Sequence, residues 1–447
     1  MIRPKSEATN GCKMGWNRWY VAGSYLRSAL WIVPLIALVL EQVTIRVLAR
    51  LDLYLGFVPQ LATTAAGVIG EMDTVITLTG SFIVFTFGSM LVAIQVAGGQ
   101  LTPRIIATTL LQDNTIRFTV GLFVFTLLFA VGTRAQIGPD IPQFEVTVTA
   151  MLGIACMAAF LYLIDYTARL LRPISIVWRI AEKGINVVRT VYPDTIKSPH
   201  VPRAARQPPG PADRIVEHRG TSAIVLAVNL KKLVAVAQRA NGVVEFAPRV
   251  GSFVATEEPL FRLYGGAAAI KDNVLRAQVA FGPERTIEQD STFAFRVIVD
   301  VAIKALSKAI NDPTTAVLAI DQLHRLLRQV GRRHLHDDAL YDADRKLRLI
   351  LRTPDWQDFV DLTFSEIRLY GAENFQIARR LRAMIDDLSN TLPEARQTAL
   401  RRELALLDRT LERLHAFPED LALARLPDIQ GLGGASVSNQ NPQCAPP

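Results

Sequence analysis

An uncharged run from Thr74 to Ala97 constrains this chain more than any other stretch. About 20 apolar residues are enough to cross the hydrocarbon core of a bilayer. The run also holds polar side chains, among them Ser81, Thr86 and Gln95. Because a polar group in lipid is costly, these side chains should face other helices or water. We therefore expect a membrane protein in which at least one span is more than an anchor.

Composition agrees with a membrane protein. Half of the residues are hydrophobic and the net charge is +8. In such a chain an excess of Arg indicates topology and attraction to anionic lipid rather than nucleic-acid binding. The cysteines, Cys12, Cys156 and Cys444, lie far apart and predict neither a disulfide framework nor a metal site. The basic N-terminus lacks a small-residue cleavage site, so we expect the first apolar segment to be retained.

Four spans are expected in a transmembrane domain covering 28–170. They are Ser28–Leu48, Thr74–Ala97, a short span Phe118–Thr133 and Val146–Ile164. The segments before the first span and after the fourth are both rich in Arg and Lys. Positive flanks are typical of the cytoplasmic side, so both termini should be cytoplasmic, which requires an even number of spans.

Two features of these spans are candidate functional features. A stripe of small and polar residues follows helical spacing along the second span and just beyond it: Ser81, Gly88, Gln95, Gly99 and Thr102. It could line a pore, but close helix packing through small residues explains it as well, and we favour packing. The second feature is Glu41, which lies inside the first span. It is either an intramembrane functional acid or, as we favour, a residue near the outer interface.

The remaining chain divides by composition. A cytoplasmic segment, 1–27, precedes the spans, and a basic helix with a Pro-rich linker follows them at 171–213. Five short strands are expected within a small β domain, 214–266, one of them at 233–240. Part of this domain, RVGSFVATEEPLFRL, resembles barrel-sandwich domains of the biotinyl or lipoyl type. Lys231 and Lys232 lack the Met-Lys context of a modified lysine, so we expect a structural β module.

A helical cytoplasmic domain is expected at 267–425, followed by a disordered tail at 426–447. One helix should run from Phe293 to Ile310, and a second from Thr314 to Val330. Asp312 before Pro313 is typical of a helix start, because Asp caps free N–H groups and Pro suits the first turn. Leucines spaced four and three residues apart from Leu400 onward indicate packing in a helix bundle.

The densest polar cluster lies around 285–312. Its members are Arg285, Gln289, Asp290, Arg296, Asp300, Lys304, Asn311 and Asp312. The cluster could bind an ion or form a gating contact between subunits. It could equally be a buried ion-pair network that fixes helix register, with Asp312 as a cap, and we favour this structural interpretation.

Two segments resemble one known family. The stretch ERTIEQDSTFAFRVIVDVAIKALSKAINDPTTAV, 284–317, and the stretch LVAIQVAGGQLTPRII, 91–106, are similar to motifs of the bacterial membrane proteins grouped as domain of unknown function 2254. Lys308 stands where that family usually has Pro. The resemblance implies a bacterial inner-membrane location and no settled activity.

The chain shows neither a phosphate-binding loop nor a nucleophile elbow. No His has metal-site spacing with Cys or Glu; the nearest approach is His334, His336, Asp337 and Asp338 in an expected loop. We therefore expect no cofactor, no metal and no catalytic residue. The expected partners are the bilayer and further copies of the chain, with any ligand or ion unknown. An oligomeric channel-like or transport protein is favoured, ahead of a membrane-bound sensor or scaffold and of a membrane-anchored enzyme.

Overall fold

The computed structural model describes residues 16, 17, 19, 20, 32–55, 65–100, 113–138, 141–170, 172–196, 210–335 and 338–433. The chain divides into two compact units. One is Leu26–Arg179, here called the membrane unit. The other combines Met1–Tyr25 with Ile180–Pro447 and is here called the cytoplasmic unit, after the side of the membrane expected for it. Helix α7 (Pro173–Val191) contains the point of division.

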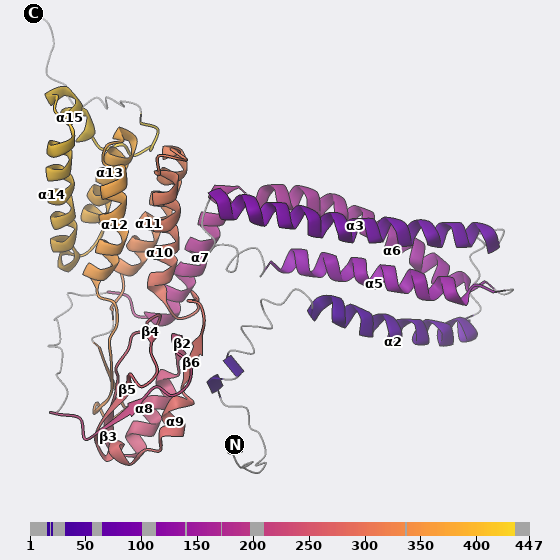
Figure 1. Ribbon diagram of the computed structural model, residues 1–447, viewed down its shortest axis with the longest axis horizontal. Coiled ribbons are helices and arrows are strands. Elements are labelled where there is room, and N and C mark those ends of the chain that lie inside the picture. The colour runs from indigo at the N-terminus through magenta and orange to yellow at the C-terminus, as the bar shows by residue number, and fades with distance from the viewer. Residues whose placement is uncertain are drawn as a thin grey trace, which may run out of the picture. The chain divides into compact units, whose positions relative to one another are not determined.

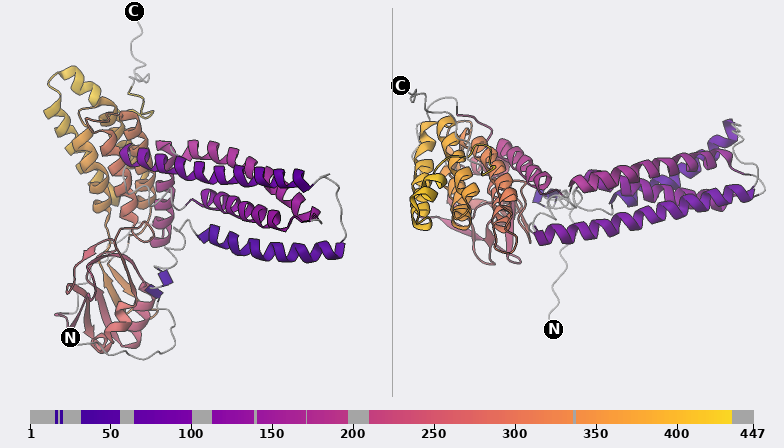
Figure 2. Two further views of the ribbon diagram at one scale, coloured as in Figure 1. Left: turned by 45° about the vertical axis from the view of Figure 1, so that its right-hand side comes forward. Right: turned by 90° about the horizontal axis from the view of Figure 1, so that it is seen from above.

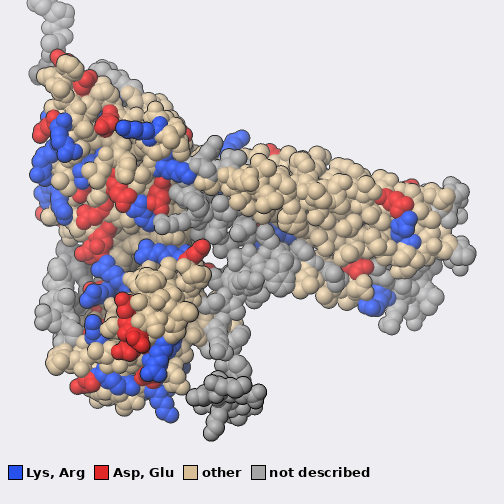
Figure 3. Space-filling model, viewed as in Figure 1, with Lys and Arg blue, Asp and Glu red and all other residues tan. Residues whose placement is uncertain are grey.

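The membrane unit is built from α2 (Ile32–Leu55), α3 (Ala65–Gln100), α5 (Asn114–Gln136) and α6 (Gln143–Leu170) (Figure 1). The last three are long and apolar enough to cross a membrane, whereas α2 holds a shorter apolar stretch, Leu35–Thr44. The described residues thus contain three candidate spans. The face of this unit in Figure 3 is mostly free of charged side chains, in contrast to the other unit.

The helices are longer than the expected spans. The third was placed between Arg117 and Arg134, but both arginines lie inside α5. The fourth was closed at Asp165, which lies inside α6. Charge limits the segment that lipid tolerates, but it does not end a helix, so the helices continue beyond the apolar stretch.

Helix α5 packs against α2, α3 and α6. Phe123 and Phe129 of α5 are fully buried, and Phe82 of α3 stacks on Phe160 of α6 with ring centres 4.2 Å apart. Gly121 permits the approach of α2, because a Cβ there would lie 2.5 Å from a methyl group of Val33. Aromatic packing and the close approach of α2 to α5 therefore help to hold this bundle together.

The described strands of the cytoplasmic unit form two sheets, and they gather at one end of this unit (Figure 2). The larger has the order β1-β5-β3-β8-β7, and the smaller has the order β4-β2-β6. All neighbours are antiparallel except β3 and β8, which are parallel. The strands are β1 (Arg214–Glu217), β2 (Ala223–Val228), β3 (Gly242–Phe246), β4 (Phe253–Val254), β5 (Pro259–Gly265), β6 (Val279–Gly282), β7 (Ala339–Tyr341) and β8 (Leu347–Leu351).

The expected β domain is corrected in two ways. The segment expected as a strand at 233–240 instead forms most of helix α8 (Leu230–Arg239) and its C-cap, Ala240. Asn229 caps the first turn of this helix, and Leu233, Val236 and Ala237 are buried. Strands also form outside the expected stretch, at β6, β7 and β8. Lys231 and Lys232 consequently lie in the first turn of a helix and not on a strand hairpin. The barrel-sandwich resemblance is not confirmed by these two sheets.

The helical part of this unit packs pairwise, α10 on α11 and α12, and α13 on α11 and α14. The expected helices at 293–310 and 314–330 are α10 (Ser291–Ala305) and α11 (Pro313–Gly331). Leu400, Leu407 and Leu411 are buried on α14, as bundle packing requires. The other elements are η2 (Gly266–Ala269), α9 (Asp272–Arg276), α12 (Trp356–Gly371), α13 (Phe375–Thr391), η3 (Glu394–Arg396), α14 (Gln397–Leu414) and α15 (Pro418–Ala424).

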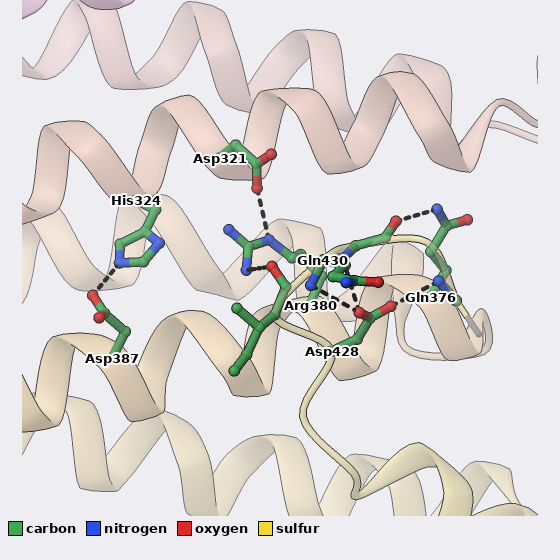
Figure 4. A network of polar contacts seen from close by, with 10 residues as sticks. Asp321, His324, Gln376, Arg380, Asp387, Asp428 and Gln430 are labelled. Atoms are coloured by element: carbon green, nitrogen blue, oxygen red, sulfur yellow. Dashed lines mark hydrogen bonds and ion pairs between the residues drawn. The ribbon is translucent and has the colours of Figure 1, made fainter. Parts of the chain in front are cut away.

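The start of the expected disordered tail is packed against α13 (Figure 4). Asp428 is 2% exposed and accepts hydrogen bonds from the backbone N–H groups of Gln430, Gly431 and Gly433. Arg380 donates to Asp321 and to the Ile429 carbonyl. The prediction of disorder from residue 426 was therefore wrong as far as 433, and the rest of the tail lies outside the described residues.

Candidate functional site

A cavity of about 610 Å³ lies within the cytoplasmic unit, between the ends of several strands and the starts of several helices. Its walls come from four connections, those after β2, β3, β6 and β8, together with the end of α7 and Trp16. Loops that follow neighbouring strands lie close together, and the side chains on such loops can converge on a ligand. This cavity is the candidate site.

Four members of the predicted polar cluster line the cavity: Arg285, Gln289, Asp290 and Arg296. Gln289 is tied to the end of β2, since its Oε1 accepts the N–H of Val228 at 2.8 Å. Arg285 donates through Nε to the Gly251 carbonyl. These contacts fix the β6–α10 connection against the smaller sheet and hold the cavity wall in place.

Asp290 is the most buried acid of this wall, with 5% of its surface exposed. Its Oδ1 caps α10 by accepting from the N–H groups of Thr292 and Phe293. Its Oδ2 lies 4.0 Å from Nε of Arg285. Burial raises the pKa of Asp290, although hydrogen bonding from Thr292 and the charge of Arg285 act in the opposite direction. Gly251 is required beside it, because a Cβ there would lie 2.1 Å from Oδ2.

Arg296 reaches from α10 to α12. Its guanidinium donates to Asp300 on the same helix and to Glu366, with Nη1–Oε1 and Nη2–Oε2 distances of 2.5 and 2.9 Å. The pKa of Arg296 is raised, and the largest cause is its hydrogen bond to Glu366. Burial acts in the opposite direction, whereas the hydrogen bond to Asp300 and the charges of both acids raise the pKa further. This network joins two helices and presents one cation at the cavity.

The other members of the cluster do not line the cavity. Asp312 caps α11, with the N–H of Thr315 donating to Oδ1 at 3.0 Å and its hydroxyl donating to Oδ2. Asn311 has a φ of +48°, a conformation that Asn tolerates better than most residues. Asp300 supports Arg296, and Lys304 lies in the last turn of α10.

The remaining charged residues of the wall were not predicted to belong to a binding site, although Lys231 was considered from sequence as a modified lysine. They are Lys231, Arg249, Arg352 and Asp358. Arg249 and Asp358 form an ion pair of 3.4 Å across 109 residues of sequence. Among the described residues that line the cavity, five basic side chains face two acidic ones. These groups belong to separate connections, so only the tertiary fold brings them together.

Aromatic and backbone groups complete the wall. Tyr192 and Phe246 are almost fully buried beside it. Burial raises the pKa of Tyr192 to about 12, so its phenol is a neutral hydrogen-bond donor. The first turns of α8 and α10 also border the cavity, where the positive end of each helix dipole favours anions. The wall therefore suits an anionic ligand with an apolar part.

The stripe of small and polar residues on α3 does not line this cavity but lies on the surface of the membrane unit. Ser81, Gly88 and Gln95 are exposed, and a Cβ at Gly88 would meet nothing within 4 Å. The buried side of α3 carries Phe82 and Thr86 instead. The side chains at 99 and 102 lie outside the described residues. The stripe thus packs on no other described helix of its own chain.

Glu41 is 3% exposed within the membrane unit, and Gln42 donates to its carboxylate at 2.8 Å. A second polar site lies at the end of α6, where Asp113 accepts from Tyr166 at 2.6 Å and from Arg179 at 2.9 Å. Burial opposes the ionised form, but the hydrogen bonds from Tyr166 and Arg179 prevail and lower the pKa of Asp113. This triad ties the start of α5 to α6 and α7.

Within the described part of the chain, no group of three or more His, Cys, Asp or Glu residues could hold a metal ion. His336 and Asp337 of the loop considered from sequence lie outside that part, whereas Asp338 accepts from the N–H of Thr353 at 2.7 Å.

Comparison with known proteins gives one family and several relatives. Residues 27–387 match the model of a family described as "Predicted membrane protein (DUF2254)". Uncharacterised proteins of Mycobacterium tuberculosis and Mycobacterium bovis are each 24% identical over 430 residues, which cover 91% of this chain and 81% of the relative. No solved structure matches.

Proposed function

Since the chain belongs to the DUF2254 family of predicted membrane proteins, we propose that it is a membrane-bound receptor whose cytoplasmic unit binds a small anionic ligand. The observation that carries this proposal is the cavity, which combines an excess of basic side chains with the first turns of two helices. Phe246 and Leu351 at the ends of adjacent strands supply an apolar part of the wall. Small-molecule sites commonly combine such apolar walls with a few placed polar groups.

The shape of the wall suggests how binding would be transmitted. The cavity is lined by Thr190 and Tyr192 at the end of α7, and by Ser291 at the start of α10. A ligand that touches both helix ends would favour one arrangement of α7 and α10, and a ligand changes a population only through such differential contacts. We therefore place the receptor's response in α7.

The test uses the full chain in detergent, with inorganic pyrophosphate and ATP as anionic probes. Binding to the native state should raise the melting temperature with probe concentration. Lys231→Gln and Arg352→Gln should each weaken the apparent affinity by about tenfold, the value of one charge-assisted contact. Lys232→Gln, next to Lys231 on α8 but outside the cavity wall, should behave as wild type. Equal effects of the Lys231 and Lys232 substitutions would argue against the site.

We further propose that the chain crosses the bacterial inner membrane four times, with α2 as the additional span and both termini in the cytoplasm. The basic segments before α2 and after α6 support this orientation. A fourth span also explains why α2, with an apolar stretch shorter than a bilayer requires, packs on α5.

A second candidate function, an oligomeric channel-like or transport pathway, is supported by the exposed stripe on α3. Gly88 has open space around it, and small residues of this kind let helices of neighbouring subunits approach closely. Gly88→Leu should reduce the size of the detergent-solubilised particle, whereas Gly80→Leu, outside the spacing of the stripe, should not. Equal particle sizes for both variants would remove the support for an oligomer, and vesicle flux assays would then address transport directly.

A further inference from the structure

A second pocket, of about 520 Å³, lies wholly within the membrane unit, where α6 ends and α7 begins. Tyr162, Tyr166 and Arg169 line it from α6. Ile174, Trp178 and Arg179 line it from α7. It shares no residue with the cavity of the cytoplasmic unit and plays no part in the function proposed above.

The pocket lies at the end of a candidate membrane span. The uncharged stretch of α6 is followed, near the end of the helix, by the exposed ion pair between Asp165 and Arg169. Tyr162, one turn earlier, is 53% exposed and Trp178 is 50% exposed. Tyr and Trp are enriched at the boundary between hydrocarbon and water, where their apolar bodies and polar groups are both accommodated. We therefore expect the pocket to lie at the depth of lipid headgroups.

Helix α7 begins with apolar side chains on two sides. Ile176, Val177 and Ile180 are buried within the chain. Ile174 and Trp178, four residues apart on one face, remain about half exposed. Exposed apolar side chains grouped beside a span need a cover, and acyl chains are the apolar material available at that depth.

The charged groups of the pocket suit a phosphate. The guanidinium of Arg179 is held in place by Asp113 and by Tyr166, whose oxygen lies 3.1 Å from Nη2. An arginine fixed in this way loses little conformational freedom when it donates a further hydrogen bond. Arg169 pairs with Asp165, but both side chains are more than half exposed, so this pair contributes little and can be exchanged. Among the described residues of the wall there is no acid.

We propose that this pocket binds the phosphate-bearing headgroup of an anionic phospholipid. Arg169 and Arg179 would contact the phosphate, and the hydroxyl of Ser175 in the first turn of α7 would add a hydrogen bond. The acyl chains would lie along Ile174, Trp178 and Tyr162. A lipid bound there would join the end of α6 to the start of α7 and fix the angle at which α7 leaves the membrane.

The test is native mass spectrometry of the full chain, titrated with phosphatidylglycerol and with phosphatidylcholine of the same acyl chains. Both lipids carry a phosphate, but the choline of phosphatidylcholine would bring a cation beside Arg169 and Arg179, so wild type should prefer phosphatidylglycerol by about tenfold. Arg169→Gln should abolish the preference, and Trp178→Ala should weaken both lipids. Arg179 is left intact, because it also holds Asp113.

Matched controls keep the result specific. Arg189→Gln replaces an exposed arginine further along α7, and Trp19→Ala replaces another exposed tryptophan; both should retain the wild-type preference. Equal affinity for the two lipids, or equal effects of the Arg169 and Arg189 substitutions, would overturn the proposal. So would glycerol phosphate competing as well as the intact lipid, since that result would indicate a site for a free phosphate.

Discussion

At the residue scale, the polar cluster around 285–312 separates into short-range and long-range roles. Asp312 caps the helix that follows it, and this role was predictable because Asp and Pro act on adjacent backbone groups. Arg296 and Glu366 meet across 70 residues of sequence, and no local pattern indicates such a pair. Local chemistry could therefore be predicted from the sequence, whereas the cavity that shares Arg285 and Asp290 with this cluster could not.

Asp312 provides a test of capping. Asn caps a helix about as well as Asp, so Asp312→Asn should leave stability nearly unchanged. Asp312→Ala should cost about 0.5–2 kcal/mol, because the N–H of Thr315 loses its acceptor. Hydrogen exchange at the first turn of α11 in the full chain measures both variants. If exchange in the Asp312→Asn variant were as fast as in Asp312→Ala, the negative charge of Asp312, and not its capping hydrogen bond, would stabilise the helix start.

Asp290 should make stability depend on pH. Its pKa in the folded chain is raised above 3.8 by burial, so the folded state holds the proton more tightly than the unfolded state does. The contribution of Asp290 is therefore fully present below pH 3.8 and is lost as pH rises through the raised pKa. Relative to Asp290→Asn, which keeps an oxygen for the cap, wild type should lose stability over that rise. Urea titrations at several pH values measure the unfolding free energy of both proteins. If wild type gained stability relative to Asp290→Asn as pH rises, the predicted direction would be wrong.

At the element scale, helices were predicted more reliably than strands. Segment 233–240 is rich in Val and Ala, which suit a strand, but Asn229 caps its start and Leu233, Val236 and Ala237 share the buried face of a helix. Strands β7 and β8 were missed because they are short and follow a long helical stretch. Strand β8 is stabilised by pairing with β3, a long-range contact that the local sequence does not reveal.

Gly184 tests the packing of α7 on the helical part of the cytoplasmic unit. A Cβ there would lie 2.7 Å from the Cβ of Ala294 and 3.0 Å from a methyl group of Leu326. Gly184→Ala gains helix propensity but overpacks this contact, and Gly184→Leu overpacks it further. We expect the Leu variant to lose about 1–3 kcal/mol of unfolding free energy and the Ala variant less. Asn186→Ala, exposed two residues later, is the control, and urea unfolding that ranks it with Gly184→Leu would refute the close contact.

At the scale of the whole molecule, the order of the parts along the chain was predicted correctly. Apolar helices come first, a region of short strands follows, and the C-terminal part is mainly helical. Hydropathy decides this order, and hydropathy is a property of the sequence. Hydropathy does not decide the number of spans. Helix α2 is 24 residues long, which is enough to cross a bilayer, but its apolar stretch is short and contains Glu41.

Topology distinguishes three spans from four. Four spans place both termini on one side, whereas three place them on opposite sides. Reporter fusions at Lys5 and after residue 447 should both give a cytoplasmic signal, as the positive flanks predict. A periplasmic signal from one end and a cytoplasmic signal from the other would leave α2 outside the set of spans.

The parallel pairing of β3 with β8 has a consequence for how the protein is made on the ribosome. About 100 residues separate the two strands, and synthesis at about 5–20 residues per second inserts a delay of roughly 5–20 seconds between them. During this delay β3 keeps an open edge, which invites wrong pairing. Because Leu351 at the end of β8 and the residues after it form part of the cavity wall, the site is incomplete until most of the chain has been translated.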